Sequence, residues 1–291
     1  MVRNLYIALF VALLCSCSDR FQVLGLLFPL GDVVDTRFEQ SMAMTNDDAV
    51  EEYNSNSDTY SLYVCTDVHI KSTADRFTHY LNVLRNDSSA LFGIVLGDYT
   101  SKHSLLPSFL DAMSYNPATQ RYNQDIHLVL GNHDTYFAGW DEYSKKIGPS
   151  VYYWVVNTSG GKDLYIVLDS ATGTLGSKQH TWLRNFIATH RHLYRHCIIS
   201  THTNLFYTDN SQTTSGNMPI EESLSLADLF EEHRVTLVLQ GHDHYREDIY
   251  VGSVRYTIVG AISDSHTDTP AEFLRVDVSH DGVEYEWYLI R

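Results

Sequence analysis

The chain has 291 residues, of which 20 are basic, 36 are acidic and 44% are hydrophobic. These proportions exclude a disordered or fibrous protein and are typical of a globular chain long enough to bury a sizeable core. The formal net charge of −16 argues against a general nucleic-acid binder, because such proteins need a basic surface to displace counterions from phosphate. A phosphate-handling protein of this charge needs a local source of positive charge.

The first residues have the pattern of a targeting segment. Arg3 provides a positive charge, and the apolar stretch over 5–14 is too short to span a bilayer comfortably. The residues at 14–17, LCSC, resemble a bacterial lipobox. We therefore predict a lipoprotein-type signal peptide over 1–16, a lipid anchor on Cys17 and an extracytoplasmic, membrane-anchored protein of a bacterial envelope. An ordinary cleaved secretory signal is the alternative, because a cysteine two residues before the anchor is unusual in a lipobox.

Residues 17–60 are predicted to form an N-terminal extension or linker ahead of a catalytic domain over 61–291. The part over 39–60 is rich in Asn, Asp, Ser and Glu, which is typical of a surface loop. An apolar patch over 23–34 leaves two interpretations open, an added strand or an added helix that packs on the core.

From residue 61 the chain repeats one pattern, in which a short apolar run ends in a polar residue that can bind a metal. Six such runs lie over 62–66, 92–96, 126–130, 164–168, 197–201 and 235–239. Their nearly continuous apolar composition predicts strands buried on both faces. Helical spacing between the runs predicts helices around Phe77, Leu183 and Leu229. The predicted class is α/β, with polar side chains at the carboxyl ends of strands, where such sheets build ligand sites.

The last part of the chain differs from the rest. Runs over 254–259, 272–278 and 284–290 are separated by turn-rich stretches without helical spacing. This pattern predicts an antiparallel finish to the fold.

The polar residues that follow the strands are oxygen and imidazole ligands, with no thiolate among them. In chain order they are Asp67, His69, Asp98, Asn132, His202, His242 and His244. This donor set suits divalent manganese, iron or zinc, and it disfavours a closed structural zinc site, which typically uses cysteines. Each motif taken singly is also compatible with an ordinary turn or surface histidine. Only the combination of the motifs and their order along the chain distinguish a metal site from these ordinary structural interpretations.

Together these motifs carry a family resemblance. The blocks Asp67-x-His69, Gly97-Asp98, Gly131-Asn132-His133-Asp134, His202 and Gly241-His242-x-His244 resemble those of the calcineurin-like metallophosphoesterases. The resemblance covers roughly 61–262, and Gln179 with Trp182 is similar to a helix start of small bacterial members. It implies a four-layer αββα sandwich of two mixed sheets flanked by helices, with a dinuclear metal centre at one edge.

The resemblance also implies a role for each site residue. One metal would be bound by Asp67, His69 and His244. The other would be bound by Asn132, His202 and His242. Asp98 would bridge them, since a carboxylate has two oxygens and can hold two ions, whereas a neutral imidazole holds one. His133 would be a proton donor beside the substrate, and Asp134 would orient it.

Two positions depart from the family pattern. Many members carry a proline two residues after the histidine that corresponds to His202, but this chain has Asn204. Purple acid phosphatases carry a tyrosine ligand three residues after the bridging aspartate, where this chain has Ser101. The first departure leaves the shape of the loop open, and the second disfavours a purple iron centre.

These observations predict a hydrolase of phosphate esters that uses two divalent metal ions and an activated water. A more specialised phosphodiesterase, acting on cyclic nucleotides or phospholipid head groups, is the narrower alternative. A catalytically silent lipoprotein that captures phosphate or metal is the alternative outside the enzymes, but such a scaffold should have lost a ligand, and none is missing. The expected partners are small phosphate esters and, through the anchor, a membrane, with no nucleic-acid surface. The loop over 203–219 is the candidate segment for contacting, and so selecting, the leaving group of the ester.

Two cysteines remain after the N-terminal pair. Cys65 and Cys197 each lie in an apolar run. The family fold would place these runs in different sheets, so we expect two free, buried thiols and no disulfide.

Overall fold

The structure is a computed structural model that describes residues 30–71, 73–114, 125–136, 139–206, 217–263 and 271–290. The predicted signal peptide, the anchor Cys17 and the middle of the 203–219 loop lie outside these ranges. Within the described ranges, no helix has the length and apolar character needed to cross a bilayer.

One sheet has five strands in the order β12-β11-β2-β3-β4. The strands β2 (Tyr60–Cys65), β3 (Ala90–Val95) and β4 (Ile126–Leu128) run parallel to one another. β11 (Ala271–Val278) pairs antiparallel with both β2 and β12 (Val283–Ile290). Every side chain of β2 is buried, as its continuous apolar run predicts.

The other sheet has seven strands in the order β1-β5-β6-β7-β8-β10-β9. In chain order they are β1 (Glu52–Asn54), β5 (Tyr152–Thr158), β6 (Gly161–Val167), β7 (His196–Ser200), β8 (Leu237–Gln240), β9 (Glu247–Val251) and β10 (Val254–Ile258). The neighbours β6, β7, β8 and β10 are parallel, whereas β5 and β9 pair antiparallel with β6 and β10. Both sheets are mixed, as predicted. The antiparallel finish is confirmed for β11 and β12 but is wrong for the pairing of β10 with β8.

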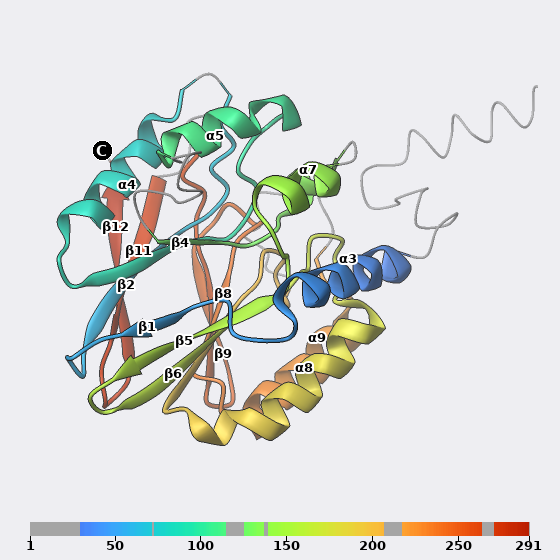
Figure 1. Cartoon of the computed structure of the whole chain (residues 1–291), viewed down its shortest axis with the longest axis vertical. Coiled ribbons are helices and arrows are strands. Elements are labelled where there is room, and N and C mark those ends of the chain that lie inside the picture. Colours follow the sequence, from blue (N-terminus) through green and yellow to red (C-terminus); the bar gives the residue numbers. More distant parts are fainter. Residues whose placement is uncertain are drawn as a thin grey trace, which may run out of the picture.

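Helices cover the outer faces of both sheets and complete four layers (Figure 1). On the five-stranded side lie η1 (His103–Leu105), α4 (Asp75–Asn86) and α5 (Leu106–Ala112), and on the seven-stranded side lie α8 (Gly176–His190), η3 (Arg191–Leu193) and α9 (Ile220–Glu232). Buried apolar side chains form one cluster between the two sheets and one cluster under each helical layer. The four-layer arrangement therefore follows from strands that are apolar on both faces and helices that are apolar on one.

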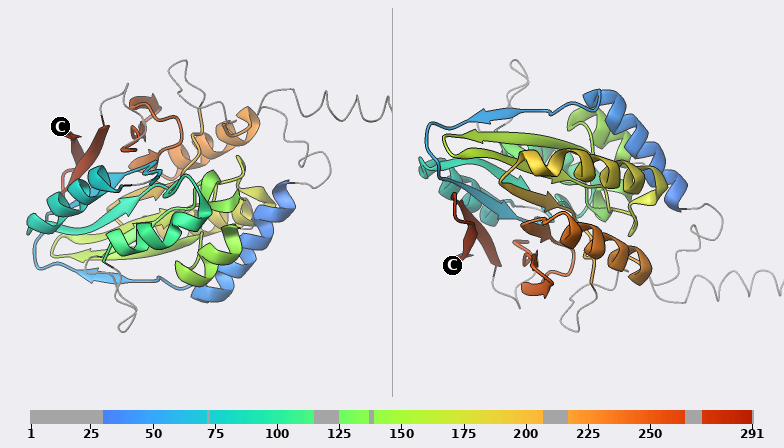
Figure 2. Two further views of the ribbon diagram at one scale, coloured as in Figure 1. Left: turned by 90° about the horizontal axis from the view of Figure 1, so that it is seen from above. Right: turned by 90° about the horizontal axis from the view of Figure 1, so that it is seen from below.

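The extension over 17–60 is not a linker throughout. Residues Leu30–Thr45 form helix α3, which lies along α8, and β1 pairs with the edge strand β5 (Figure 2). The buried face of α3 is a stripe at helical spacing, made of Val34, Arg37, Phe38 and Ser41. Half of that stripe is polar, so the apolar pattern that reveals other helices is missing from the sequence here.

The thiol prediction is confirmed. Cys65 lies on β2 and Cys197 lies on β7, in different sheets, and both are free and buried. Burial raises the pKa of the Cys197 thiol to about 12, so this thiol is not a reactive nucleophile at neutral pH.

Candidate metal centre

The carboxyl ends of β2, β3 and β4 meet those of β7 and β8 at one edge of the sandwich. Backbone hydrogen bonds join the loops that follow them: Gly241 N–H donates to the His202 carbonyl at 2.9 Å, and Asp67 N–H donates to the Gly97 carbonyl at 3.1 Å. The His242 N–H donates to Oδ2 of Asp67 at 2.9 Å and so links the two sheets. All seven side chains predicted as metal ligands come together at this edge.

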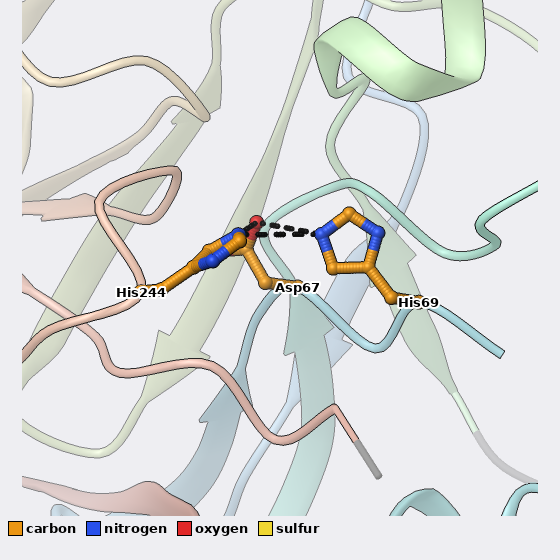
Figure 3. Close-up of side chains that lie close together, drawn as sticks. All are labelled: Asp67, His69 and His244. Carbon is orange, nitrogen blue, oxygen red and sulfur yellow. Dashed lines mark hydrogen bonds and ion pairs between the residues drawn. The ribbon is translucent and has the colours of Figure 1, made fainter. Parts of the chain in front are cut away.

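The first group of donors contains Asp67, His69 and His244 (Figure 3). Nε2 of His244 lies 3.1 Å from Oδ1 of Asp67, and Nε2 of His69 lies 3.5 Å from the same oxygen. The two Nε2 atoms are 3.3 Å apart. Nε2 of His69 is also 3.6 Å from Oδ2 of Asp98. The three atoms converge on one point at the strand ends.

The second group contains Asn132, His202 and His242. Nε2 of His202 lies 3.0 Å from Oδ1 of Asn132, 3.2 Å from Nδ1 of His242 and 3.6 Å from Oδ1 of Asp98. Oδ1 of Asp98 therefore faces this group, whereas its Oδ2 faces His69 of the first group. One carboxylate stands between two sets of donors, in the position that the resemblance implies for the bridge.

Hydrogen bonds around the second group determine which atoms can bind a cation. Nδ1 of His202 lies 2.6 Å from the carbonyl oxygen of Leu96, so this nitrogen carries the proton and Nε2 presents a lone pair. That lone pair faces the Asn132 oxygen, which is also an acceptor, and two acceptors at this distance repel unless a cation lies between them. Ligand bonds of about 2.0–2.2 Å give donor–donor spacings of roughly 3.0–3.5 Å. The residues fit a divalent metal.

The two carboxylates of the centre have pKa values shifted in opposite directions. Burial would raise the pKa of Asp67, but the imidazoles of His244 and His69 outweigh it and hold the pKa well below its usual range. Burial raises the pKa of Asp98 to about 7, and the charge of Asp67 adds to this rise although His69 opposes it. Asp98 therefore lies where negative charge is uncompensated, which a cation would relieve.

Five ligand residues adopt the left-handed backbone conformation, with φ of 49° at Asp67, 43° at His69, 55° at Asp98, 72° at His242 and 59° at His244. Such conformations cost about 1–3 kcal/mol each and persist where the surroundings over-determine them. Gly97 has φ of +100°, and a Cβ there would lie 2.7 Å from Nδ1 of His202. These sharp turns direct the Asp and His side chains toward one point. Backbone strain of this kind is found at functional sites.

His133 lies beside the centre, outside the two ligand sets described above, although His133, His69 and Asp98 also offer a third set of donor atoms that could hold a metal ion. Its side chain is 38% exposed, and its Nε2 is 3.9 Å from Oδ2 of Asp98. Burial, followed by the neighbouring His69, lowers the pKa of His133 to about 4, so the resting imidazole is neutral. This half-exposed position is compatible with the predicted contact to a substrate.

The structure shows other contacts for Asp134 than the predicted one with His133. Both carboxylate oxygens of Asp134 accept backbone N–H groups, from Asp98 and Gly131 at 2.9 Å and from Tyr99 at 3.1 Å. The side chain therefore does not orient the His133 ring. It ties the loop that carries Asp98 to the start of α6 (Asn132–Thr135), because buried backbone donors in a sharp turn need acceptors.

Several supporting residues were not predicted. The Oγ of Ser170 accepts the Thr203 N–H at 2.9 Å and the Thr201 hydroxyl at 2.6 Å, so the two neighbours of His202 are held by one side chain. Ser101 donates its hydroxyl to the His69 carbonyl and so supports the backbone of a ligand. A single serine after a strand is too common a signal to find these contacts from the sequence.

A family model described as calcineurin-like phosphoesterase matches residues 60–246. The chain belongs to this family. The match agrees with the motif blocks and with the two mixed sheets. A search of curated proteins finds no significant match to the sequence.

Solved structures confirm the calcineurin-like fold at low sequence identity. GAP50, described as the anchor in the inner membrane complex of Plasmodium, is 13% identical with a TM-score of 0.61 over 79% of this chain and 84% of its own. A dimetal phosphatase from Danio rerio is 12% identical with a TM-score of 0.53, over 78% and 98%. A purple acid phosphatase from yellow lupin is 13% identical with a TM-score of 0.61, over 81% and 52%. At these identities the likeness concerns the fold alone.

Proposed function

We propose that the protein is a metal-dependent hydrolase of phosphate esters with a dinuclear centre. The observation that carries the proposal is the position of Asp98, whose two oxygens face separate groups of donors. The first ion would be held by Asp67, His69 and His244, the second by Asn132, His202 and His242, and Asp98 would contact both. All of these donors except His244 are buried, which favours strong electrostatic interaction with a cation.

The residues around the centre support hydrolysis by an activated water. Bound divalent ions would supply positive charge for the phosphate oxygens and lower the pKa of a water that attacks phosphorus. Asp98 would fix the separation of the two donor groups. His133 would donate a proton to the departing oxygen, and an anionic ester bound beside its ring would raise the low pKa of this imidazole.

The charge of the molecule is compatible with an anionic substrate only at close range. Two divalent ions bring four positive charges, and Asp67 and Asp98 remove two, which leaves about +2 at the centre. The formal charge of −16 on the chain repels anions at a distance. Screening beyond roughly 8–10 Å weakens that repulsion, so the local field dominates at contact. Small phosphate esters are the proposed substrates, with phosphodiesters of cyclic nucleotides or phospholipid head groups as the narrower possibility.

An activity screen tests this function. The mature protein, loaded with Mn²⁺, is assayed against an alkyl phosphomonoester, a phosphodiester and a cyclic nucleotide, and its metal content is measured. We expect about two ions per chain and hydrolysis of at least one class. Asp98→Asn should bind metal more weakly and lose hydrolysis of every substrate, because the group that separates both donor sets is altered. Metal-loaded protein without activity on any ester would contradict the proposal.

A silent scaffold is the second candidate. The likeness to GAP50, whose description is that of an anchor, is the observation in its favour. The convergence of all seven ligand side chains argues for catalysis, since a scaffold has no need to retain five strained ligand conformations. The same screen separates the two, because a silent scaffold hydrolyses none of the esters.

We also propose that the protein acts outside the cytoplasm, held to a membrane by a lipid on Cys17. The support is the charged and apolar N-terminal pattern and the LCSC motif at 14–17. Replacement of Cys17 by alanine should release the protein from the membrane fraction, which fractionation and blotting measure. A variant that remains in the membrane fraction would show that another feature anchors the chain.

A further inference from the structure

Tyr136 contacts one metal-ligand side chain directly. It follows the short helix α6, four residues after Asn132, and the Nδ2 group of Asn132 donates a hydrogen bond to its hydroxyl oxygen at 2.8 Å. Oδ1 of the same amide lies 3.0 Å from Nε2 of His202, inside the second donor group. The two ends of the Asn132 amide therefore face different partners, the tyrosine on the outside and the proposed metal position on the inside.

The orientation of this amide decides whether Asn132 can bind a metal. A rotation of 180° exchanges the carbonyl oxygen and the NH₂ group, and only the oxygen is a ligand. Nε2 of His202 presents a lone pair, because its Nδ1 donates to Leu96. The reversed amide would donate to that lone pair, so without an outer acceptor for the NH₂ group the unproductive orientation is favoured. The Tyr136 hydroxyl is that outer acceptor.

We propose that Tyr136 is a positioning residue that sets the metal affinity of the site formed by Asn132, His202 and His242. This inference rests on the proposed function. The ring also lies beside His133, with ring centroids 4.9 Å apart, and Tyr136 is 39% exposed. A phenylalanine at this position keeps the ring and removes only the hydroxyl, so Tyr136→Phe isolates the hydrogen bond from the packing.

Tyr245 provides a matched control. It directly follows the ligand His244 and has the same exposure of 39%. Its hydroxyl makes no hydrogen bond to a ligand side chain among the described residues. Tyr245→Phe therefore removes the hydroxyl of an equally exposed tyrosine beside the centre without altering the Asn132 amide.

The test is a calorimetric titration of the metal-free wild-type protein, Tyr136→Phe and Tyr245→Phe with Mn²⁺. In Tyr136→Phe we expect one of the two sites to bind about ten-fold more weakly, the lower end of the effect of outer hydrogen-bond partners, and the other site to be unchanged. Tyr245→Phe should match the wild type at both sites. Excess Mn²⁺ should bring the kcat of Tyr136→Phe back toward the wild-type value.

Two outcomes would overturn the proposal. Equal Mn²⁺ affinities in Tyr136→Phe and the wild type would remove the positioning role and leave the proposed function intact. An activity loss in Tyr136→Phe that excess Mn²⁺ does not restore, at unchanged affinity, would assign the hydroxyl to substrate rather than to metal. A wild-type protein that binds no Mn²⁺, iron or zinc would contradict the dinuclear function itself.

Discussion

The candidate metal centre and helix α3 both bury charged side chains, and they compensate that charge in different ways. Around α3, Arg37 donates to both oxygens of Asp169 at 2.7 and 2.9 Å, and Ser150 donates a further hydrogen bond at 2.9 Å. At the metal centre, the inward atoms of Asn132 and His202 are acceptors that face one another. The first cluster has its lone pairs occupied by protein donors, whereas the second retains lone pairs for a cation.

This difference separates a structural cluster from a binding site. A buried ion pair with complete hydrogen bonds stabilises one packing arrangement and offers nothing to a ligand. A buried group of acceptors on loops in the left-handed conformation is destabilised by repulsion between the acceptors and by backbone strain. A cation that enters the group relieves the repulsion and lowers the free energy.

The largest expected effect is the loss of hydrolysis when His133, at the edge of the centre, is replaced. Replacement of His133 by asparagine should leave about two metal ions per chain, because neither of the ligand sets proposed for the two ions includes this ring, although its Nε2 lies 3.9 Å from Oδ2 of Asp98. Hydrolysis of an alkyl phosphate should fall by about 10²–10⁴, the usual contribution of a positioned acid. A nitrophenyl ester should lose much less, since its leaving group needs little protonation. Rates on both esters and metal analysis measure this, and equal losses on both esters would remove His133 from the acid role.

A second experiment addresses α3. Replacement of Arg37 by methionine leaves the buried Asp169 carboxylate without its cation, and the free energy of unfolding in urea should fall by about 3–5 kcal/mol. Glu39→Gln on the same helix breaks the exposed pair with Lys178 and should change stability by less than about 0.5 kcal/mol. Arg37→Met should retain two metal ions per chain in the folded protein. A loss below 1 kcal/mol in Arg37→Met would show that the pair contributes little.

The smallest effect is a pH dependence of metal affinity. The pKa of Asp98 in the metal-free protein is raised to about 7, mainly by burial, so below pH 7 this carboxyl must lose a proton before it binds a cation. The Mn²⁺ affinity should therefore rise about ten-fold from pH 6 to pH 8 and level off above that. Calorimetry in buffers of different ionisation enthalpy should detect proton release near pH 6. An affinity that falls with pH in this window would contradict the sign of the shift.

The sequence indicated which side chains come together at the strand ends because its signals are local. Each ligand follows directly after an apolar run that becomes a buried strand, and parallel strands bring their carboxyl ends to one edge. The two histidines of Gly241-His242-x-His244 and the Gly131-Asn132 turn are such signals. The order of the blocks then indicated the family and the four-layer arrangement. Strand β5 was missed although it is rich in aromatic and β-branched residues.

Other features depend on contacts between residues far apart in the chain. The partner of Arg37 lies 132 residues away, and the hydroxyl of Ser41 meets Ser150 109 residues away, so no local pattern reveals that α3 belongs to the domain. Asp134 shows the same limit, since the family resemblance implied a partner in His133, but its carboxylate accepts three backbone N–H groups in the folded structure.

The candidate metal ligands and the strands that carry them were evident from local sequence, since apolar periodicity and ligand chemistry are properties of neighbouring residues. Only the folded structure shows which oxygen of Asp98 faces which group, which nitrogen of His202 carries the proton and which end of the Asn132 amide points inward. These choices depend on hydrogen-bond partners contributed by other loops. The free energy of each alternative orientation depends on distances and directions that exist only after the two sheets have packed.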